Sequence, residues 1–313
     1  MCEERKTAER HLDARTFQQP LNDLAITLVF KVQREGPRLL PTPQFVIPDI
    51  YYLIRQCHQT CNLLFFLNAE ERRKKDPDWV IAYSAASLPL IRTMIDCLYN
   101  ITAILGNPAS KGEQFRVSGY KNVLETLDAD EKRYGGDHKW DEWIAEQRKM
   151  IGFDMRLNGF TEAQVRATKS WWPTLSRYLK VKEDTPVTPH QEFLKKLTLG
   201  FWQEYSALSH AMFQGLTTIG VFLAPKDLPH EHRPMVEDRG EIMIGQHVPR
   251  AAAILLCTLT EVQAYFRFDL EGVARINQRL HQIWNALLPV PEIKELYDER
   301  YGKLMQDKGI NPG

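Results

Sequence analysis

One stretch of the chain combines an arginine, an acid and an amide at intervals of one helical turn. Arg92, Asp96 and Asn100 are spaced i, i+4 and i+8, and Arg92 and Asp96 are the only charged residues between Trp79 and Ser110. Side chains at this spacing share one face of a helix. Burying either charge alone is costly, so the pattern predicts a paired, partly buried arrangement. The alternative is a solvent-exposed stripe with one weak ion pair.

A second apolar stretch carries the hydroxyls and the imidazole that acyl or phosphoryl chemistry would need. Ser206 and His210 are one turn apart, as a nucleophile and its base would be. Tyr205 and Ser209 adjoin them, and we expect this face to meet Arg92 and Asp96 across a helix pair. No third orienting group is visible, and the GxSxG pattern is absent. The interpretation we prefer is a packed, hydrogen-bonded histidine. Arg92, Asp96, Ser206 and His210 remain catalytic candidates, and Asn100, Tyr205 and Ser209 are binding candidates.

Residues 225–249 hold six prolines and glycines, which predict a long loop. We expect it to be ordered against the rest of the molecule, with His230 and His232 as candidates for ligand contact. Long loops in compact domains are often functional. The alternative is that a loop tip rich in His and acids is only a solvated surface. Cys57 and Cys61 are two thiols without the four ligands that structural zinc needs. The sequence therefore assigns no metal and no cofactor.

A cationic segment with aromatic residues suggests a nucleic-acid partner. Arg166, Lys169 and Arg177 are interleaved with Trp171 and Trp172, and no acid interrupts the run from Ala163 to Lys182. Cations can contact phosphates while aromatic rings stack on bases. The preferred alternative is that the aromatics are core and the cations are solvated. The whole chain gives no support for a nucleic-acid partner, because its 40 basic and 40 acidic side chains cancel.

Helical signals position these residues along most of the chain. Pro77 suits a first helical position, and Gly106-Asn107-Pro108 predicts the end of that helix. Thr161 with Gln164 resembles a capping box, and Asp49 is expected to cap an earlier helix. Further helices are expected at residues 109–133, 137–157, 190–223 and 250–306. The fold class predicted is all-α, a helical bundle with long buried central helices.

The domain organisation follows from where proline and polar residues gather. Residues 1–45 are expected to form an N-terminal extension with a Pro-rich linker, because four prolines lie between residues 36 and 48. Residues 46–306 form the predicted helical domain, with the loop at 225–249. Residues 307–313 are expected to be a tail.

Composition excludes several classes of protein. The 313 residues are 43% hydrophobic and 26% charged, which is typical of a soluble globular chain and excludes collagen-like and wholly disordered proteins. The charged start predicts no secretory signal, and five cysteines in mostly apolar runs favour reduced thiols in the cytoplasm. Residues 205–224 lack charge but hold six Ser, Thr, His and Gln residues, so we expect a buried helix and no membrane span.

Arg92 with Asp96, then Trp172-Pro173, then the run from Glu204 to His210 together resemble a bacterial helical family catalogued only as a domain of unknown function. The resemblance covers roughly residues 50–285. It implies an α-helical bundle with a polar site between helices, and no established reaction. Two features depart from the family. Its acid is more often Glu, and its His lies about one turn after the Ser, whereas His210 directly follows Ser209.

Two function classes are carried forward from the sequence. The first is a soluble protein that binds a ligand or partner through a polar inter-helix site. The alternative is an RNA-acting, defence-type ribonuclease of a helical nucleotide-binding class. Such nucleases carry an Arg, then four to six residues, then a His, which Arg275 and His281 match. Arg92 with His210 would be the other pair. Whether the protein is an enzyme is left open.

Overall fold

The computed structural model contains helices and connecting loops. It describes residues 14–39, 43–69, 77–169, 171–180, 188–198, 233–268 and 275–310, of which 14–15, 39, 77–88 and 233–245 are described by their backbone alone. Within these ranges no residue is in a strand. The predicted all-α class is therefore confirmed.

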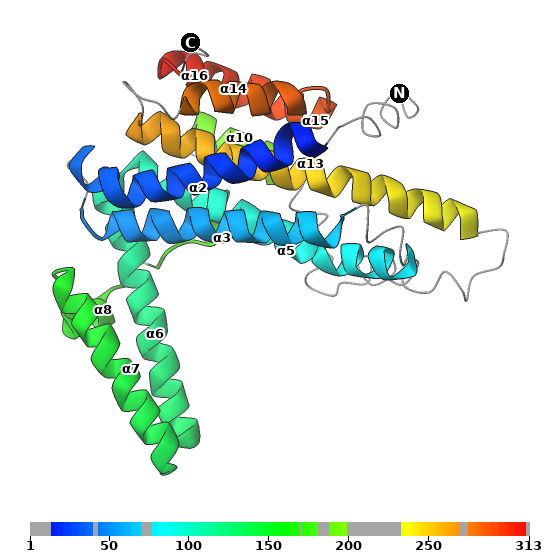
Figure 1. Ribbon diagram of the computed structural model, residues 1–313. Helices are drawn as coiled ribbons and strands as arrows, with labels where there is room; N and C mark the ends of the chain where they lie inside the picture. The colour runs from blue at the N-terminus through cyan, green and yellow to red at the C-terminus, as the bar shows by residue number, and fades with distance from the viewer. Residues whose placement is uncertain are drawn as a thin grey trace.

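Long helices pack side by side to form the body of the molecule (Figure 1). α2 (Ala14–Leu39) packs on α3 (Val46–Leu67), and α3 packs on α5 (Pro77–Gly106). α13 (Arg233–Phe266) contacts all three of them, and α14 (Ile276–Leu287) lies against α2 and α13. Three short elements complete the chain: α15 (Pro291–Leu296), η4 (Tyr297–Tyr301) and α16 (Gly302–Asp307).

α13 is the central helix of this bundle. Every residue from Ala251 to Ala264 is buried, so this part of the helix is covered on all sides. A helix without a solvated face must be surrounded by other elements. The long helix predicted at 77–105 is present as α5, and α13 is a second long helix in the core. Of the helix predicted at 190–223, α10 (Pro189–Leu197) forms the start, and residues 199–223 lie outside the described residues.

The N-terminal part of the chain belongs to the bundle, so the prediction of an extension and linker over residues 1–45 is wrong for residues 14–39. α2 buries an apolar stripe in the core, formed by Phe17, Leu21, Leu24, Leu28 and Val32. Pro20 and Pro37 lie inside this helix. A proline removes one backbone hydrogen bond, but the continuous buried stripe outweighs that loss.

The predicted loop at 225–249 is also wrong from residue 233 onward, because α13 begins at Arg233. Pro234 is in its first turn, where a missing N–H costs nothing. Pro249 lies inside the helix and is buried. An interior proline costs about 3 kcal/mol, and the fully buried segment that follows it supplies the compensation. Residues 225–232, including His230 and His232, lie outside the described residues.

A helical hairpin projects from the body as an arm (Figure 1). After η1 (Pro108–Gly112), the arm consists of α6 (Glu113–Tyr134), α7 (His138–Leu157) and α8 (Glu162–Ala167). It has its own small core of five buried residues, Val117, Tyr120, Leu124, Met155 and Val165. Asp137 caps α7, and Thr161 with Gln164 forms the predicted capping box of α8. The predicted helices at 77–105, 109–133 and 137–157 are confirmed to within a few residues.

Arg116 of α6 joins the arm to the body. Its guanidinium donates to both carboxylate oxygens of Asp49 in α3, at 2.8 and 3.2 Å, and to the carbonyl oxygen of Phe45 at 2.9 Å. It also reaches Asp154 of α7 at 3.4 Å. Asp49 is therefore an ion-pair partner inside the first turn of α3 and not the cap predicted from the sequence.

Within the part of the chain that the structure describes, no helix combines the length and the apolar character needed to cross a membrane.

Candidate functional site

The polar ribbon of α5 lies at the edge of the core. Arg92, Asp96 and Asn100 are each half-buried, whereas Ile91, Met94, Ile95 and Leu98 on the same helix are buried in the bundle. α5 therefore holds these three polar side chains along one line at the edge of the bundle. Arg92 and Asp96 are neither fully solvated nor fully buried. Their exposure is intermediate between the buried pair and the solvent-exposed stripe considered from the sequence.

Asp96 is an acid whose charge is incompletely compensated. Burial raises the pKa of its carboxyl above the ordinary value, and the positive charge of Arg92 opposes that rise without cancelling it. An Asp paired in the open would show the opposite direction, because a nearby cation stabilises the carboxylate. A hydrogen-bond donor at Asp96 would favour its charged form.

Asn100 already has a partner. Its side-chain oxygen accepts a hydrogen bond from the indole Nε1–H of Trp172 at 2.8 Å, and the backbone N–H of Trp172 donates to Ser118 at 2.7 Å. Next to it, the Tyr99 hydroxyl donates to the carbonyl oxygen of Pro173 at 2.8 Å. The segment 171–180, called the strap below, therefore lies across the C-terminal half of α5. Asn100 positions this strap, and Asp96 and Arg92 lie one and two turns further toward the N-terminus of the helix.

An aromatic row continues from α5 toward a histidine that the sequence did not single out. The ring of Tyr99 lies 5.1 Å from that of Tyr178, which in turn is 6.4 Å from the imidazole of His190. Nε2 of His190 is buried and has no hydrogen-bond partner among the described residues. Burial, assisted by the charge of Arg300, lowers the pKa of His190 to about 3. The imidazole is neutral at physiological pH. In the sequence, the only indication of His190 is its position after Thr188-Pro189 at the start of a helix.

The other candidates of the polar site, Tyr205, Ser206, Ser209 and His210, lie outside the described residues, as do His230 and His232. The predicted meeting of Arg92 and Asp96 with that helix face therefore stays a prediction.

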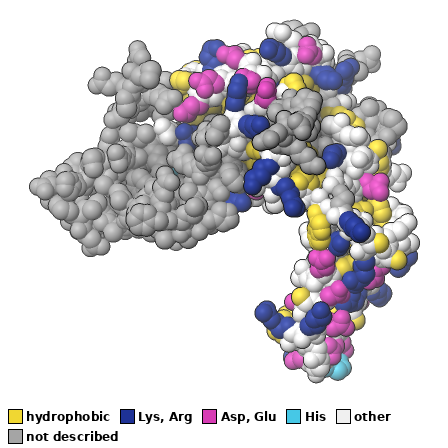
Figure 2. Space-filling model, turned by 180° about the vertical axis from the view of Figure 1, so that it is seen from behind, with side chains coloured by type: hydrophobic (Ala, Val, Ile, Leu, Met, Phe, Trp, Pro, Cys, Tyr) yellow, Lys and Arg dark blue, Asp and Glu magenta, His cyan; other side chains and the backbone are white. Residues whose placement is uncertain are grey.

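The cationic segment divides into structural and exposed residues. Trp172 is packed between Tyr99 and Phe115, and Arg166 is bound by acids of the arm. Lys169 and Arg177 are exposed, and Trp171 keeps 38% of its surface accessible. Lys121 Nζ lies 4.8 Å from the centre of the Trp171 ring. Figure 2 shows Lys and Arg side chains on this face where the arm meets the body, while acids and bases alternate along the arm.

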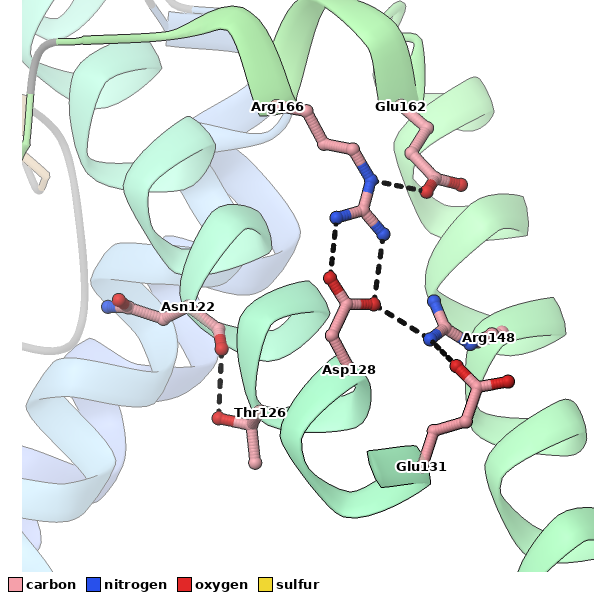
Figure 3. A network of polar contacts seen from close by, with 7 residues as sticks. All are labelled: Asn122, Thr126, Asp128, Glu131, Arg148, Glu162 and Arg166. Carbon is pink, nitrogen blue, oxygen red and sulfur yellow. Dashed lines mark hydrogen bonds and ion pairs between the residues drawn. The ribbon is translucent and has the colours of Figure 1, made fainter. Parts of the chain in front are cut away.

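Arg166 takes part in an ion-pair network that ties the three arm helices together (Figure 3). Asp128 of α6 accepts hydrogen bonds from Arg166 of α8 at 2.7 and 3.2 Å and from Arg148 of α7 at 2.7 Å. Nε of Arg166 also donates to Glu162, and the Arg148 nitrogen that binds Asp128 also donates to Glu131. The hydrogen bonds from Arg166, and then those from Arg148, lower the pKa of Asp128 to about 2.

We expect Asp128→Asn to lower the free energy of unfolding by about 0.5–1 kcal/mol, because one third of this side chain remains exposed and solvent screens the pairs. A lowered acid pKa contributes stability above the unfolded value, and this contribution is lost as the pH falls toward 2. Urea denaturation at about 0.05 and 0.5 M NaCl is the measurement, and the loss should shrink at the higher salt. Asp130→Asn, two residues along α6, serves as the control. A loss of the same size in both variants would contradict the prediction.

The two residues of the second nuclease pair, Arg275 and His281, lie at the start and in the middle of α14. Arg275 is exposed at the N-cap of α14 with φ of 45°. A ring nitrogen of His281 is 2.7 Å from the carbonyl oxygen of Ile310, which is itself buried. His281 thus fixes the C-terminal segment against α14. The predicted tail at 307–313 is accordingly packed at Ile310.

Thiols and histidines are structural where they are described. Cys57 and Cys61 are buried, and burial raises their pKa. His58 contacts the side chain of Asn22 at 2.7 Å. Within the described ranges, no group of three or more His, Cys, Asp or Glu side chains is placed to hold a metal ion.

Comparison with known proteins gives no family, because no family model, no curated protein and no solved structure matches this chain.

Proposed function

We propose that this protein is a binding protein whose ligand site is the face of α5 that carries Arg92 and Asp96. The observation that carries the proposal is the half-buried pair itself. The pKa of Asp96 is raised by burial although a cation lies one turn away. A bound molecule that donates to Asp96 would stabilise the carboxylate.

The chemistry of the pair indicates the class of ligand. A guanidinium offers a planar set of donors that matches carboxylate and phosphate oxygens, and a carboxylate accepts hydroxyl or amine donors. We therefore propose a small polar ligand that presents an anionic group to Arg92 and a donor to Asp96. The strap at 171–180 and the row of Tyr99 and Tyr178 would border this ligand on the C-terminal side of the pair.

The test is thermal unfolding with inorganic phosphate as the anionic probe, against chloride at equal ionic strength. For a dissociation constant near 1 mM, about 10 mM phosphate stabilises the folded state by about 1.4 kcal/mol, or about 3 °C. We expect this shift in the wild type and its loss in Arg92→Gln. Arg133→Gln, an exposed arginine near the far end of α6, should keep it. No shift in the wild type, or an equal shift in Arg92→Gln, would contradict the proposal.

A second candidate, binding of single-stranded RNA, is supported by the partly exposed Trp171 with Lys121 above its ring and Lys169 and Arg177 nearby. In fluorescence anisotropy with a labelled single-stranded RNA, Arg177→Gln should weaken binding and reduce its salt dependence, while Arg92→Gln should not. Cleavage of that RNA by the wild type, lost in Arg92→Gln, would instead support the ribonuclease alternative.

A further inference from the structure

α7 of the arm has two apolar faces, and among the described residues only one of them packs into a core. Ile144, Ile151 and Met155 point toward α6 and the small core of the arm, with Ile144 and Met155 buried. On the other side, Trp143 is 46% exposed, Met150 51%, Phe153 57% and Leu157 69%. At about 100° per residue, these four side chains occupy a stripe less than about 90° wide. The stripe runs most of the length of a helix that spans about 30 Å.

The spacing of this stripe is that of a helix which packs against another helix. Trp143, Met150 and Leu157 are seven residues apart, and Phe153 occupies an intervening position. A seven-residue apolar repeat is the seam of a coiled coil, in which both partners present the same pattern. Glu146 lies within the same stripe, seven residues before Phe153, and is its one acidic position. Exposed apolar groups that gather on one face mark interaction sites in soluble proteins.

The charges beside the stripe indicate a partner with the same sequence in the antiparallel direction. Glu142, Lys149 and Arg156 follow one edge of the stripe, again seven residues apart. If two copies of α7 cross in opposite directions near Met150, Glu142 of each copy lies opposite Arg156 of the other. Two favourable pairs then form, and only Lys149 meets its own copy. Lys149 is already beside Glu146 of its own helix, at 3.7 Å.

The position of the arm also favours this direction. α7 begins at the tip of the arm and ends near its base, where Asp154 meets Arg116 (Figure 1). In an antiparallel pair, each tip reaches the base of the other arm, and the two bodies lie at opposite ends. In a parallel pair the two bodies would be side by side.

We infer that the exposed stripe of α7 is the docking surface for a second copy of this chain, which forms an antiparallel pair of arms. This inference does not depend on the ligand proposed for α5.

The test is sedimentation equilibrium of the full chain across a range of concentrations up to about 100 μM. We expect a dimer in the wild type and a monomer in Met150→Glu, which places two carboxylates at the crossing point. Circular dichroism shows whether this variant keeps its helices. Phe30→Glu in α2, which removes a comparably exposed apolar side chain from the body of the molecule, should leave the dimer intact. A wild type that stays monomeric, or a dimer unaffected by Met150→Glu, would overturn the inference.

Charge reversal tests the direction of the pair even if Met150→Glu fails to fold. Glu142→Arg and Arg156→Glu should each raise the dissociation constant about tenfold, because each places like charges opposite one another. The double variant Glu142→Arg/Arg156→Glu restores opposite charges and should recover most of the wild-type affinity. Additive losses in the double variant would overturn the antiparallel arrangement.

Discussion

Arg116→Gln should destabilise the protein strongly at pH 7.5 and much less at pH 4.5. The guanidinium of Arg116 is the cation that compensates Asp49, whose side chain is almost completely buried. Removing one partner of a buried ion pair costs about 3–5 kcal/mol, because the remaining charge has no compensation. At the lower pH, Asp49 takes up a proton and the cost disappears with its charge. Urea denaturation at both pH values measures the effect.

The sign of the pH dependence follows from the wild type. Burial, opposed by Arg116, raises the pKa of Asp49 from 3.8 to about 6. Between these two values the folded state binds more protons than the unfolded state, so stability falls as the pH rises. The stability attached to Asp49 is fully present below 3.8 and is lost as the pH rises through 6, by about 3 kcal/mol. Without Arg116, the carboxyl pKa rises further and the fall becomes steeper.

The double variant Asp49→Asn/Arg116→Gln isolates this mechanism. It removes both charges, so most of the loss and the steep pH dependence should disappear. Arg133→Gln, an exposed arginine further along α6, should change stability by less than about 0.5 kcal/mol. Equal losses in Arg116→Gln at pH 4.5 and 7.5 would show that the arm is held by other contacts.

The helices of the arm and of α5 could be predicted because their signals are local. Pro77 at a helix start, the capping box at Thr161 and Gln164, and the cap at Asp137 each act within one turn. The two errors concern prolines. α2 and α13 both contain interior prolines, and the local rule predicts a break at each. The burial that outweighs these prolines comes from helices distant in the sequence, so no local pattern reveals it.

The candidate site was predictable in its residue types but not in its partners. The charge-poor context of Arg92 and Asp96 indicated a half-buried pair. Asn100 binds the indole of Trp172, which is 72 residues away in the sequence. This contact depends on the path of the strap, which no local pattern predicts. The same is true of Arg116 and Asp49, which are 67 residues apart. Arginines on amphipathic helices are common, and only the fold identifies the one that reaches a buried acid.

Arg300→Met should cost about as much as Arg116→Gln, for the same physical reason at the other end of the bundle. Arg300 in η4 donates to both oxygens of Glu261 in α13, at 2.6 and 3.0 Å, and its guanidinium carbon lies 5.7 Å from the centre of the Phe193 ring. The side chain of Glu261 is only 8% exposed. Methionine keeps much of the packing on Phe193 but leaves this carboxylate buried and uncompensated. We expect a loss of about 3–5 kcal/mol in urea denaturation at neutral pH.

The decisive comparison is with Glu261→Leu/Arg300→Met, which replaces the buried pair by two apolar side chains of similar size. Such replacements are often neutral or stabilising, because neither charge has to leave water. The double variant should therefore be more stable than either single variant, with a coupling energy of about 2–3 kcal/mol in the mutant cycle. His190 supplies an independent readout, since the charge of Arg300 helps to hold its pKa near 3. Removal of that charge should raise the pKa, as followed by NMR titration. Additive losses and an unchanged His190 pKa would mean that the pair is solvated in solution and does not help to join η4 to α13.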